Sequence, residues 1–259
     1  MLRRHILTSV ILTLVVGIGL GLLYPAVVWG ISAVAFPWRA NGSLVHRNGQ
    51  VVGSALIGQE FLGKDGNPDP RYFQPRPSSA GAGYDPTASG ASNLGPSNPL
   101  LVGFIPGLNT VDLNGNPSSA NPFATKDDPY CVPTDGKTGN PVTSPSPGQQ
   151  YAKNKDGSYV CDANTVPERT LGYRQLNNLD ASVKVPVDAV TGSGSGLDPD
   201  ISVANADLQA ARVASARKLP VSTVMALVKR HTNNPQWGFL GETTVNVLDL
   251  NLALDALHA

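Results

Sequence analysis

The chain has 259 residues, a formal net charge of zero and only 15% charged residues. Proteins that bind nucleic acid through its phosphates need a basic surface, so this balance argues against nucleic acid as a partner. The 27 glycines and 22 prolines predict many turns, and the length suits one ordinary domain with insertions.

The N-terminal stretch is the most apolar part of the chain. No charged side chain lies between Arg4 and Arg39, and residues 6–23 would span about 27 Å as a helix, close to the ~30 Å hydrocarbon core of a bilayer. We therefore predict one transmembrane helix, with residues 1–38 as the anchor and its flanks. Basic residues precede this helix, so the positive-inside rule places the N-terminus in the cytoplasm and the large domain outside.

Alternatives remain open for the anchor. Ala33-Val34-Ala35 fits a signal-peptide cleavage site, but the apolar run exceeds the 7–15 residues usual for a signal peptide, which favours a retained anchor. Gly17 and Gly21 form a small-xxx-small pair that would let another helix pack closely, although such pairs also occur in helices without a partner. Pro25 predicts a kink or the end of the regular helix.

Residues 39–259 are predicted to form one extracytoplasmic domain. Asn48-Gly49, between two β-prone runs at 43–47 and 50–57, predicts a β-hairpin. The Gly-, Pro- and Ser-rich run that follows is typical of a flexible linker. Its regularly spaced aromatic residues favour instead an ordered loop with aromatic anchors (Phe61, Tyr72, Phe73 and Tyr84).

Residues 102–180 are predicted to be a loop insertion within this domain. They contain many turn-forming pairs, no sustained periodicity and both cysteines, Cys131 and Cys161. In an oxidising compartment a disulfide is expected, worth about 3.6 kcal/mol for a loop of about thirty residues, with two free thiols as the alternative. Scattered histidines and the lack of a Cys-x-x-Cys motif give no support for a zinc site.

Regular structure is predicted again near the C-terminus. Ser202 would cap a helix that runs to about Arg217, and Ser222 would cap a second helix that ends in a basic turn. A last helix from about Val247 would follow a short strand, since the leucines there fit both an alternating and a helical pattern. The expected fold is mixed α/β: one N-terminal transmembrane helix followed by a single extracytoplasmic α+β domain.

No catalytic motif stands out. The glycine–serine run at 192–196 lacks the lysine of a Walker A loop and the spacing of a dinucleotide loop. Residues 135–140 resemble the phosphorylation motif of P-type pumps, but an extra glycine after Asp135 breaks the spacing. A membrane-anchored periplasmic hydrolase stays an alternative, with His46 or His231 as the only reasonable base, as does a ligand-binding module that uses the insertion.

Short motifs follow one another in a fixed order along the chain. They are Tyr24-Pro25, the runs at 40–43, 53–59, 72–78, 92–98 and 193–199, Gln209 with Arg212-Val213-Ala214, and the segment 241–254. Over about residues 1–100 and 181–258, this series closely resembles the C subunit of the bacterial Kdp potassium-transporting P-type ATPase. The chain departs from that family in having Asp200 where histidine is common.

The resemblance implies a non-catalytic accessory subunit of an ATP-driven, high-affinity potassium uptake pump in the bacterial inner membrane, which stabilises the complex and could assist ATP binding by the catalytic subunit. The implied partners are a channel-like potassium-binding subunit, a catalytic P-type subunit and a small membrane subunit. No intrinsic cofactor is implied, and ATP would be reached only through the complex. Gln209 is the matching residue for a nucleotide contact, with a hydrogen bond at the helix surface as the simpler role.

The loop residues that match the family motifs are expected to be structural or to lie at subunit interfaces. They are Asn41, Gly58, Gln59, Arg76, Ser92, Asn93, Asn98, Ser195, Gly196 and Asp198.

Overall fold

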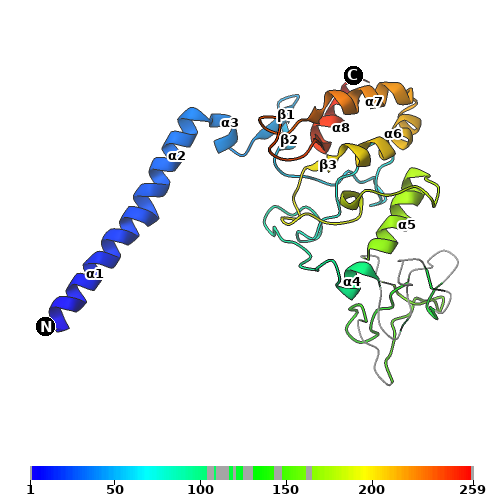
Figure 1. Cartoon of the computed structure of the whole chain (residues 1–259), viewed down its shortest axis with the longest axis horizontal. Helices are drawn as coiled ribbons and strands as arrows, with labels where there is room; N and C mark the ends of the chain where they lie inside the picture. The colour runs from blue at the N-terminus through cyan, green and yellow to red at the C-terminus, as the bar shows by residue number, and fades with distance from the viewer. Residues whose placement is uncertain are drawn as a thin grey trace. The chain divides into compact units, whose positions relative to one another are not determined.

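The computed structural model describes residues 2–103, 108, 117–118, 121–124, 131–142, 148–161 and 165–257. The chain forms two compact units, Met1–Leu56 and Ile57–Ala259 (Figure 1). The first unit includes the hairpin as well as the apolar helix. The predicted class is confirmed: one apolar N-terminal helix and a mixed helix and strand domain.

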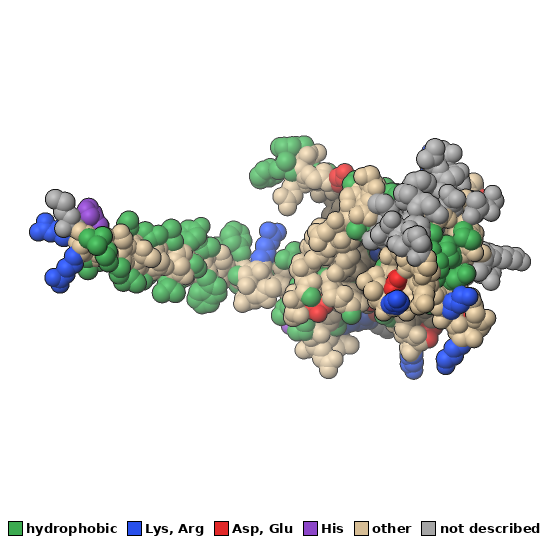
Figure 2. Space-filling model, turned by 90° about the horizontal axis from the view of Figure 1, so that it is seen from below, with side chains coloured by type: hydrophobic (Ala, Val, Ile, Leu, Met, Phe, Trp, Pro, Cys, Tyr) green, Lys and Arg blue, Asp and Glu red, His purple; other side chains and the backbone are tan. Residues whose placement is uncertain are grey.

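The first unit is dominated by a helix that continues from Leu2 to Ala35. It consists of α1 (Leu2–Ile18), a π-helical turn η1 (Gly19–Leu23) and α2 (Tyr24–Ala35). Hydrophobic side chains cover it along its length, with basic side chains at its start (Figure 2). It is long and apolar enough to cross a membrane, and none of its residues is buried inside the protein.

Pro25 does not end this helix. Proline has no N–H to donate to the carbonyl of Gly21, and its ring crowds that carbonyl in a regular α-helix. A wider π turn directly before Pro25 accommodates the proline. In this turn the N–H of Tyr24 donates to the carbonyl of Gly19, five residues back.

A short helix α3 (Pro37–Ala40) leads into the hairpin predicted around Asn48-Gly49. Strands β1 (Leu44–Arg47) and β2 (Gln50–Ser54) pair antiparallel, with an irregularity in register between Val45 and His46. Asn48 and Gly49 both have positive φ, as the two-residue turn requires.

The core of the second unit lies in its C-terminal part. Three short strands form an antiparallel sheet in the order β3 (Asp200–Ser202), β5 (Thr244–Asn246), β4 (Thr232–Asn233). Helices α6 (Val203–Arg217), α7 (Val221–Arg230) and α8 (Val247–Ala256) pack with it (Figure 1). Their shared apolar cluster includes Phe73, Ile201, Val213, Val224, Val245, Leu250 and Leu254.

The helix caps explain where these elements begin. The hydroxyl of Ser202 accepts a hydrogen bond from the N–H of Asn205 at 3.1 Å, which confirms it as the cap of α6. Asn246 caps α8 in the same way, directly after strand β5. The predicted cap at Ser222 is wrong, because α7 begins at Val221 and the cap position is held by Pro220, two residues earlier.

Part of the predicted insertion 102–180 is a helix and not a loop. After the short α4 (Pro99–Val102), helix α5 occupies Val166–Asn177, and the hydroxyl of Thr165 accepts from the N–H of Glu168 at its start. Tyr173 of α5 donates to Asn205 of α6 at 2.8 Å, so this helix belongs to the core unit. The helix was missed because it is polar and packs by hydrogen bonds, which leave no apolar periodicity.

The described residues between α4 and α5 include a second, smaller apolar cluster. Cys131 and Cys161 form a disulfide there, and the ring of Phe123 lies 4.7 and 4.9 Å from the rings of Tyr151 and Tyr159. The carboxylate of Asp135 accepts from two backbone N–H groups at 2.7 and 2.8 Å, so the motif that resembles a phosphorylation site is a turn.

Residues 57–98 contain no helix or strand of the main sheet, yet they are ordered around buried aromatic rings. Phe73 and Tyr84 are buried, and the rings of Phe61 and Tyr72 lie 5.4 Å apart. The loop with aromatic anchors is therefore the correct reading of this run.

Candidate functional site

The motif loops of the second unit meet in one place, which we call the loop cluster (Gly58, Arg76, Ser78, Tyr84, Gly196 and Asp198). The guanidinium of Arg76 forms an ion pair with the carboxylate of Asp198 at 3.1 Å and donates to the carbonyls of Thr191 and Gly192. A loop at 76–78 is thereby joined to a loop more than a hundred residues later.

Two glycines of the loop cluster lie where no side chain fits. A Cβ on Gly58 would stand 2.3 Å from the Tyr84 ring and 2.7 Å from the carbonyl oxygen of Asp198. Gly196 has a φ of +69°, and a Cβ there would stand 2.5 Å from the carbonyl oxygen of Gly90. These glycines allow the loops to approach backbone to backbone.

Tyr84 and Ser78 complete the loop cluster. The phenol of Tyr84 donates to the carbonyl of Arg76 at 2.9 Å, and burial raises its pKa, which keeps it a neutral donor at physiological pH. The hydroxyl of Ser78 donates to the carbonyl of Gly196 at 2.6 Å and accepts from the N–H of Tyr84 at 2.9 Å. Every polar group named here is used inside the protein.

A second polar group, which we call the amide network, consists of Gln74, Asn205, Gln209, Arg212 and Asn251. Gln209 is only 1% exposed. Its carbonyl accepts from Gln74 N–H at 2.7 Å and from Arg212 at 2.8 Å, while its amide donates to the carbonyl of Gln74 at 3.0 Å and to Asn205 at 2.9 Å. These four hydrogen bonds use the whole capacity of a glutamine side chain.

Arg212 joins the segment at residues 70–72 to helix α6. Its guanidinium donates to the carbonyls of Pro70 and Tyr72 at 2.8 and 3.0 Å and to Asn177 at 2.9 Å. Burial lowers its pKa to about 10. Asn251 of α8 holds the same segment by donating to the carbonyl of Phe73 and accepting from its N–H.

Sequence reasoning named Gln209 but missed the amide network. Asn205, Gln209 and Arg212 are four and three residues apart, so they share one face of α6 with buried apolar neighbours. Three long polar side chains on a buried helix face are the signal that could have found it, because buried polar groups need partners.

The profile of the family described as KdpC, K+-transporting ATPase, c chain, matches residues 6–107 and 144–256. The chain belongs to this family.

Curated relatives support the same assignment over the whole chain. The potassium-transporting ATPase KdpC subunit of Mycobacterium tuberculosis is 41% identical over 256 residues, which cover 99% of this chain and 100% of the relative. The KdpC subunit of Gemmatimonas aurantiaca is 39% identical over 259 residues, covering 100% and 96%. That of Acidobacterium capsulatum is 37% identical over 255 residues, covering 98% and 100%.

Membership in the KdpC family makes the chain an accessory subunit of a potassium pump, not itself the catalyst, and associates it with a membrane. The hydrolase and ligand-binding alternatives are not favoured. The family profile leaves residues 108–143 unmatched, a shorter segment than the predicted insertion at 102–180.

The structure brings only some of the predicted site residues together. Gly58, Arg76, Gly196 and Asp198 lie in the loop cluster, and the carbonyl of Ser195 accepts from Gly90 N–H at its edge. Of the remaining motif residues, Asn41 bonds locally to Pro37 in the first unit, Gln59 directly follows Gly58 and is half-buried, Ser92 and Asn93 are exposed, and Asn98 is half-buried before α4. Gly17 and Gly21 lie on the long helix.

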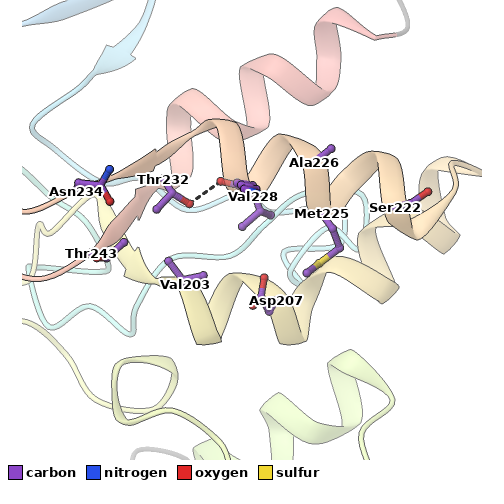
Figure 3. A pocket seen from close by; sticks show the side chains of 10 residues that line it. Val203, Asp207, Ser222, Met225, Ala226, Val228, Thr232, Asn234 and Thr243 are labelled. Carbon is purple, nitrogen blue, oxygen red and sulfur yellow. Dashed lines mark hydrogen bonds between the residues drawn. The ribbon is translucent and has the colours of Figure 1, made fainter.

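A cavity of about 780 Å³ lies beside α6 and α7, lined by Val203, Asp207, Met225, Val228 and Thr232 among others (Figure 3). The hydroxyl of Thr232 donates to the carbonyl of Val228 at 2.8 Å, as drawn in that view. Burial raises the pKa of Asp207. Within the described residues, no group of three or more His, Cys, Asp or Glu side chains could hold a metal ion.

Proposed function

We propose that this chain serves its pump as an assembly subunit, with one helix packed among the membrane subunits and an extracytoplasmic domain that acts as a rigid body. The observation that carries the proposal is the contrast between the two units. The long helix buries none of its residues within the chain, whereas the side chains of the loop cluster and the amide network bond to partners inside the domain.

The glycine pair gives the helix a surface for a partner helix. Apart from the adjoining residues and the backbone of the same helix turns, no atom of the described chain lies within 4 Å of a Cβ built on Gly17 or Gly21. Small residues four apart let two helix backbones approach closely in a membrane. The partners that we expect are the channel-like potassium-binding subunit, the catalytic P-type subunit and a small membrane subunit.

Any influence on ATP binding would be transmitted through subunit contacts. Gln209 is the residue proposed for a nucleotide contact, but its amide has no unused hydrogen-bonding position in this conformation. We therefore propose no intrinsic cofactor, and a structural role for Gln209.

Co-purification of the pump from mild detergent tests the helix surface. Gly17→Leu and Gly21→Leu should each lower the amount of partner subunits recovered with this chain, because leucine prevents close backbone approach. Gly19→Leu is the matched control, since Gly19 lies about 200° around the helix from Gly17 and has equally open space. Recovery that is equal in all three variants would contradict the proposal.

Orientation can be tested separately by labelling. Arg3 and Arg4 lie before the apolar run, so we propose a cytoplasmic N-terminus and an extracytoplasmic domain. Since the disulfide uses both native cysteines, Lys64→Cys and His5→Cys each introduce a single free thiol. A membrane-impermeant maleimide should label Lys64→Cys in intact cells and His5→Cys only after lysis. The reverse pattern would overturn the orientation.

A further inference from the structure

The loop between β4 and β5 exposes a set of large apolar side chains. Trp237 is 83% exposed, Phe239 72% and Leu240 46%. We call residues 235–241 the aromatic loop. No charged side chain occurs from residue 232 to residue 241. Three neighbouring apolar side chains with such exposure indicate a contact with something outside this chain.

The backbone of the aromatic loop is largely satisfied by itself. Gln236 and Leu240 exchange two hydrogen bonds of 2.9 Å, and the N–H of Gly238 donates to the carbonyl of Pro235 at 3.0 Å. The N–H of Phe239 donates to Gln236. A loop that bonds its own N–H groups can enter a region with little water at low cost.

Trp237 adopts an unusual backbone conformation for a bulky residue. Its φ is +54°, in the left-handed region that favours glycine or asparagine. Its ring is mostly exposed, so packing inside the chain does not compensate for this conformation. Strain of this kind, when held without an internal contact, points to a functional role for the side chain.

Two features of the chain favour lipid as the partner that the aromatic loop contacts. The first unit carries a helix that can cross a bilayer, and residues 36–56 connect it to the second unit, so the start of the second unit stays within roughly 75 Å of that helix even with the connection fully extended. A tethered contact needs only modest affinity. Tryptophan, phenylalanine and leucine are also the side chains that enter the membrane interface.

The charges that flank the aromatic loop in sequence suit lipid headgroups. Lys229 and Arg230 are exposed in the last turn of α7, and Glu242 is the only acidic residue between positions 229 and 242. Lysine and arginine beside an apolar insertion interact with phosphate groups.

We propose that the aromatic loop inserts its tip into the headgroup region of the leaflet that faces the domain, as a second and reversible membrane contact besides the N-terminal helix. This contact would orient the domain against the bilayer. It does not depend on assembly with the other pump subunits.

The test uses the full chain in nanodiscs of phosphatidylcholine and phosphatidylglycerol. The chain has three tryptophans, so Trp29→Phe with Trp38→Phe leaves Trp237 as the only one. Brominated phospholipids quench indole emission on contact. We expect a loss of Trp237 emission with brominated lipid and a blue-shifted spectrum with ordinary lipid. Solvent-like emission that brominated lipid does not quench would overturn the proposal.

Further variants separate insertion from other contacts. Phe239→Ser with Leu240→Ser should restore the emission, whereas Val221→Ser, which removes an exposed apolar side chain outside the aromatic loop, should leave the quenching unchanged. Quenching that persists in the double serine variant would contradict insertion. A blue shift that occurs only in the assembled pump and without lipid quenching would assign the aromatic loop to a protein partner instead.

Discussion

At the scale of single residues, Gln209 shows how burial decides the role of a polar side chain. Gln209→Leu keeps the volume but leaves Gln74 N–H and one guanidinium N–H of Arg212 without an acceptor in the core. Each of these two groups costs about 1–3 kcal/mol, so we expect a loss of about 2–6 kcal/mol in the free energy of unfolding. Denaturant unfolding of the full chain in detergent measures it.

A matched control for this variant is Gln175→Leu on the exposed face of α5. It should change stability by less than about 0.5 kcal/mol. If Gln209→Leu left stability unchanged and lowered only the ATP affinity of the assembled pump, the structural role would be wrong and the nucleotide contact would gain support.

Asp69 should make stability depend on acid. Hydrogen bonds from the Arg71 side chain hold the pKa of Asp69 below its usual 3.8. A lowered folded-state pKa contributes stability above the unfolded pKa of about 3.9 and loses it as the pH falls through the folded value. We expect Asp69→Asn to unfold at a lower temperature than the wild type at pH 7, with the difference shrinking below pH 4.

Asp207→Asn is the comparison variant, because the pKa of Asp207 is shifted in the opposite direction from that of Asp69. Partial burial raises the pKa of Asp207, so its carboxylate adds no stability to the folded chain above the unfolded pKa, and replacing it should not destabilise the chain. If Asp69→Asn and Asp207→Asn destabilised the chain equally at pH 7, the opposite pKa shifts assigned to these two carboxylates would be wrong.

At the scale of elements, the amino-acid pattern predicted those that combine a cap with an apolar face. Helix α6 follows Ser202 and ends at Arg217 as expected, and α8 follows the short strand β5. Helix α5 was missed because its packing depends on Tyr173 and Asn177, whose hydrogen bonds leave no periodic signal. The cap of α7 was misplaced because Pro220 sets the extended backbone that Ser222 was expected to supply.

The disulfide should stabilise its own region and not the C-terminal core. Cys131 and Cys161 lie in the smaller apolar cluster, separate from the one that contains α6 and α8. The entropy model gives about 3.6 kcal/mol for a loop of this length. We expect Cys131→Ser with Cys161→Ser to accelerate amide hydrogen exchange within residues 131–161.

Exchange in α6 provides the internal control for that variant. Its amides should keep their protection, because local opening does not require the core to unfold. Faster exchange in α6 as well would mean that the two apolar clusters unfold together, contrary to the prediction.

At the scale of the whole molecule, the fold class could be predicted from composition, but the function came from the order of motifs. Within the described residues, the loop cluster contains no nucleophile paired with a base and no group of metal ligands. The function could therefore not be predicted from a catalytic or metal-binding motif. Arg76, Gly196 and Asp198 lie in segments that the family profile matches, and in this chain they join loops that are distant in sequence.

The apolar helix is longer than a membrane requires. Residues 6–35 would span about 45 Å against a hydrocarbon core of ~30 Å. The excess must be accommodated by tilt or by extension beyond the lipid, and packing against neighbouring helices decides which.

The π turn at Gly19–Leu23 adds one residue to a single turn of this helix. Side chains before it and after it are therefore out of phase by about 100° relative to an uninterrupted α-helix. In a regular α-helix the face that contains Gly17 would continue with a repeat of about 3.6 residues per turn. After the π turn, the residues on that face are shifted by one position along the sequence. A face that begins at Gly17 therefore points in a different direction before the π turn than after it.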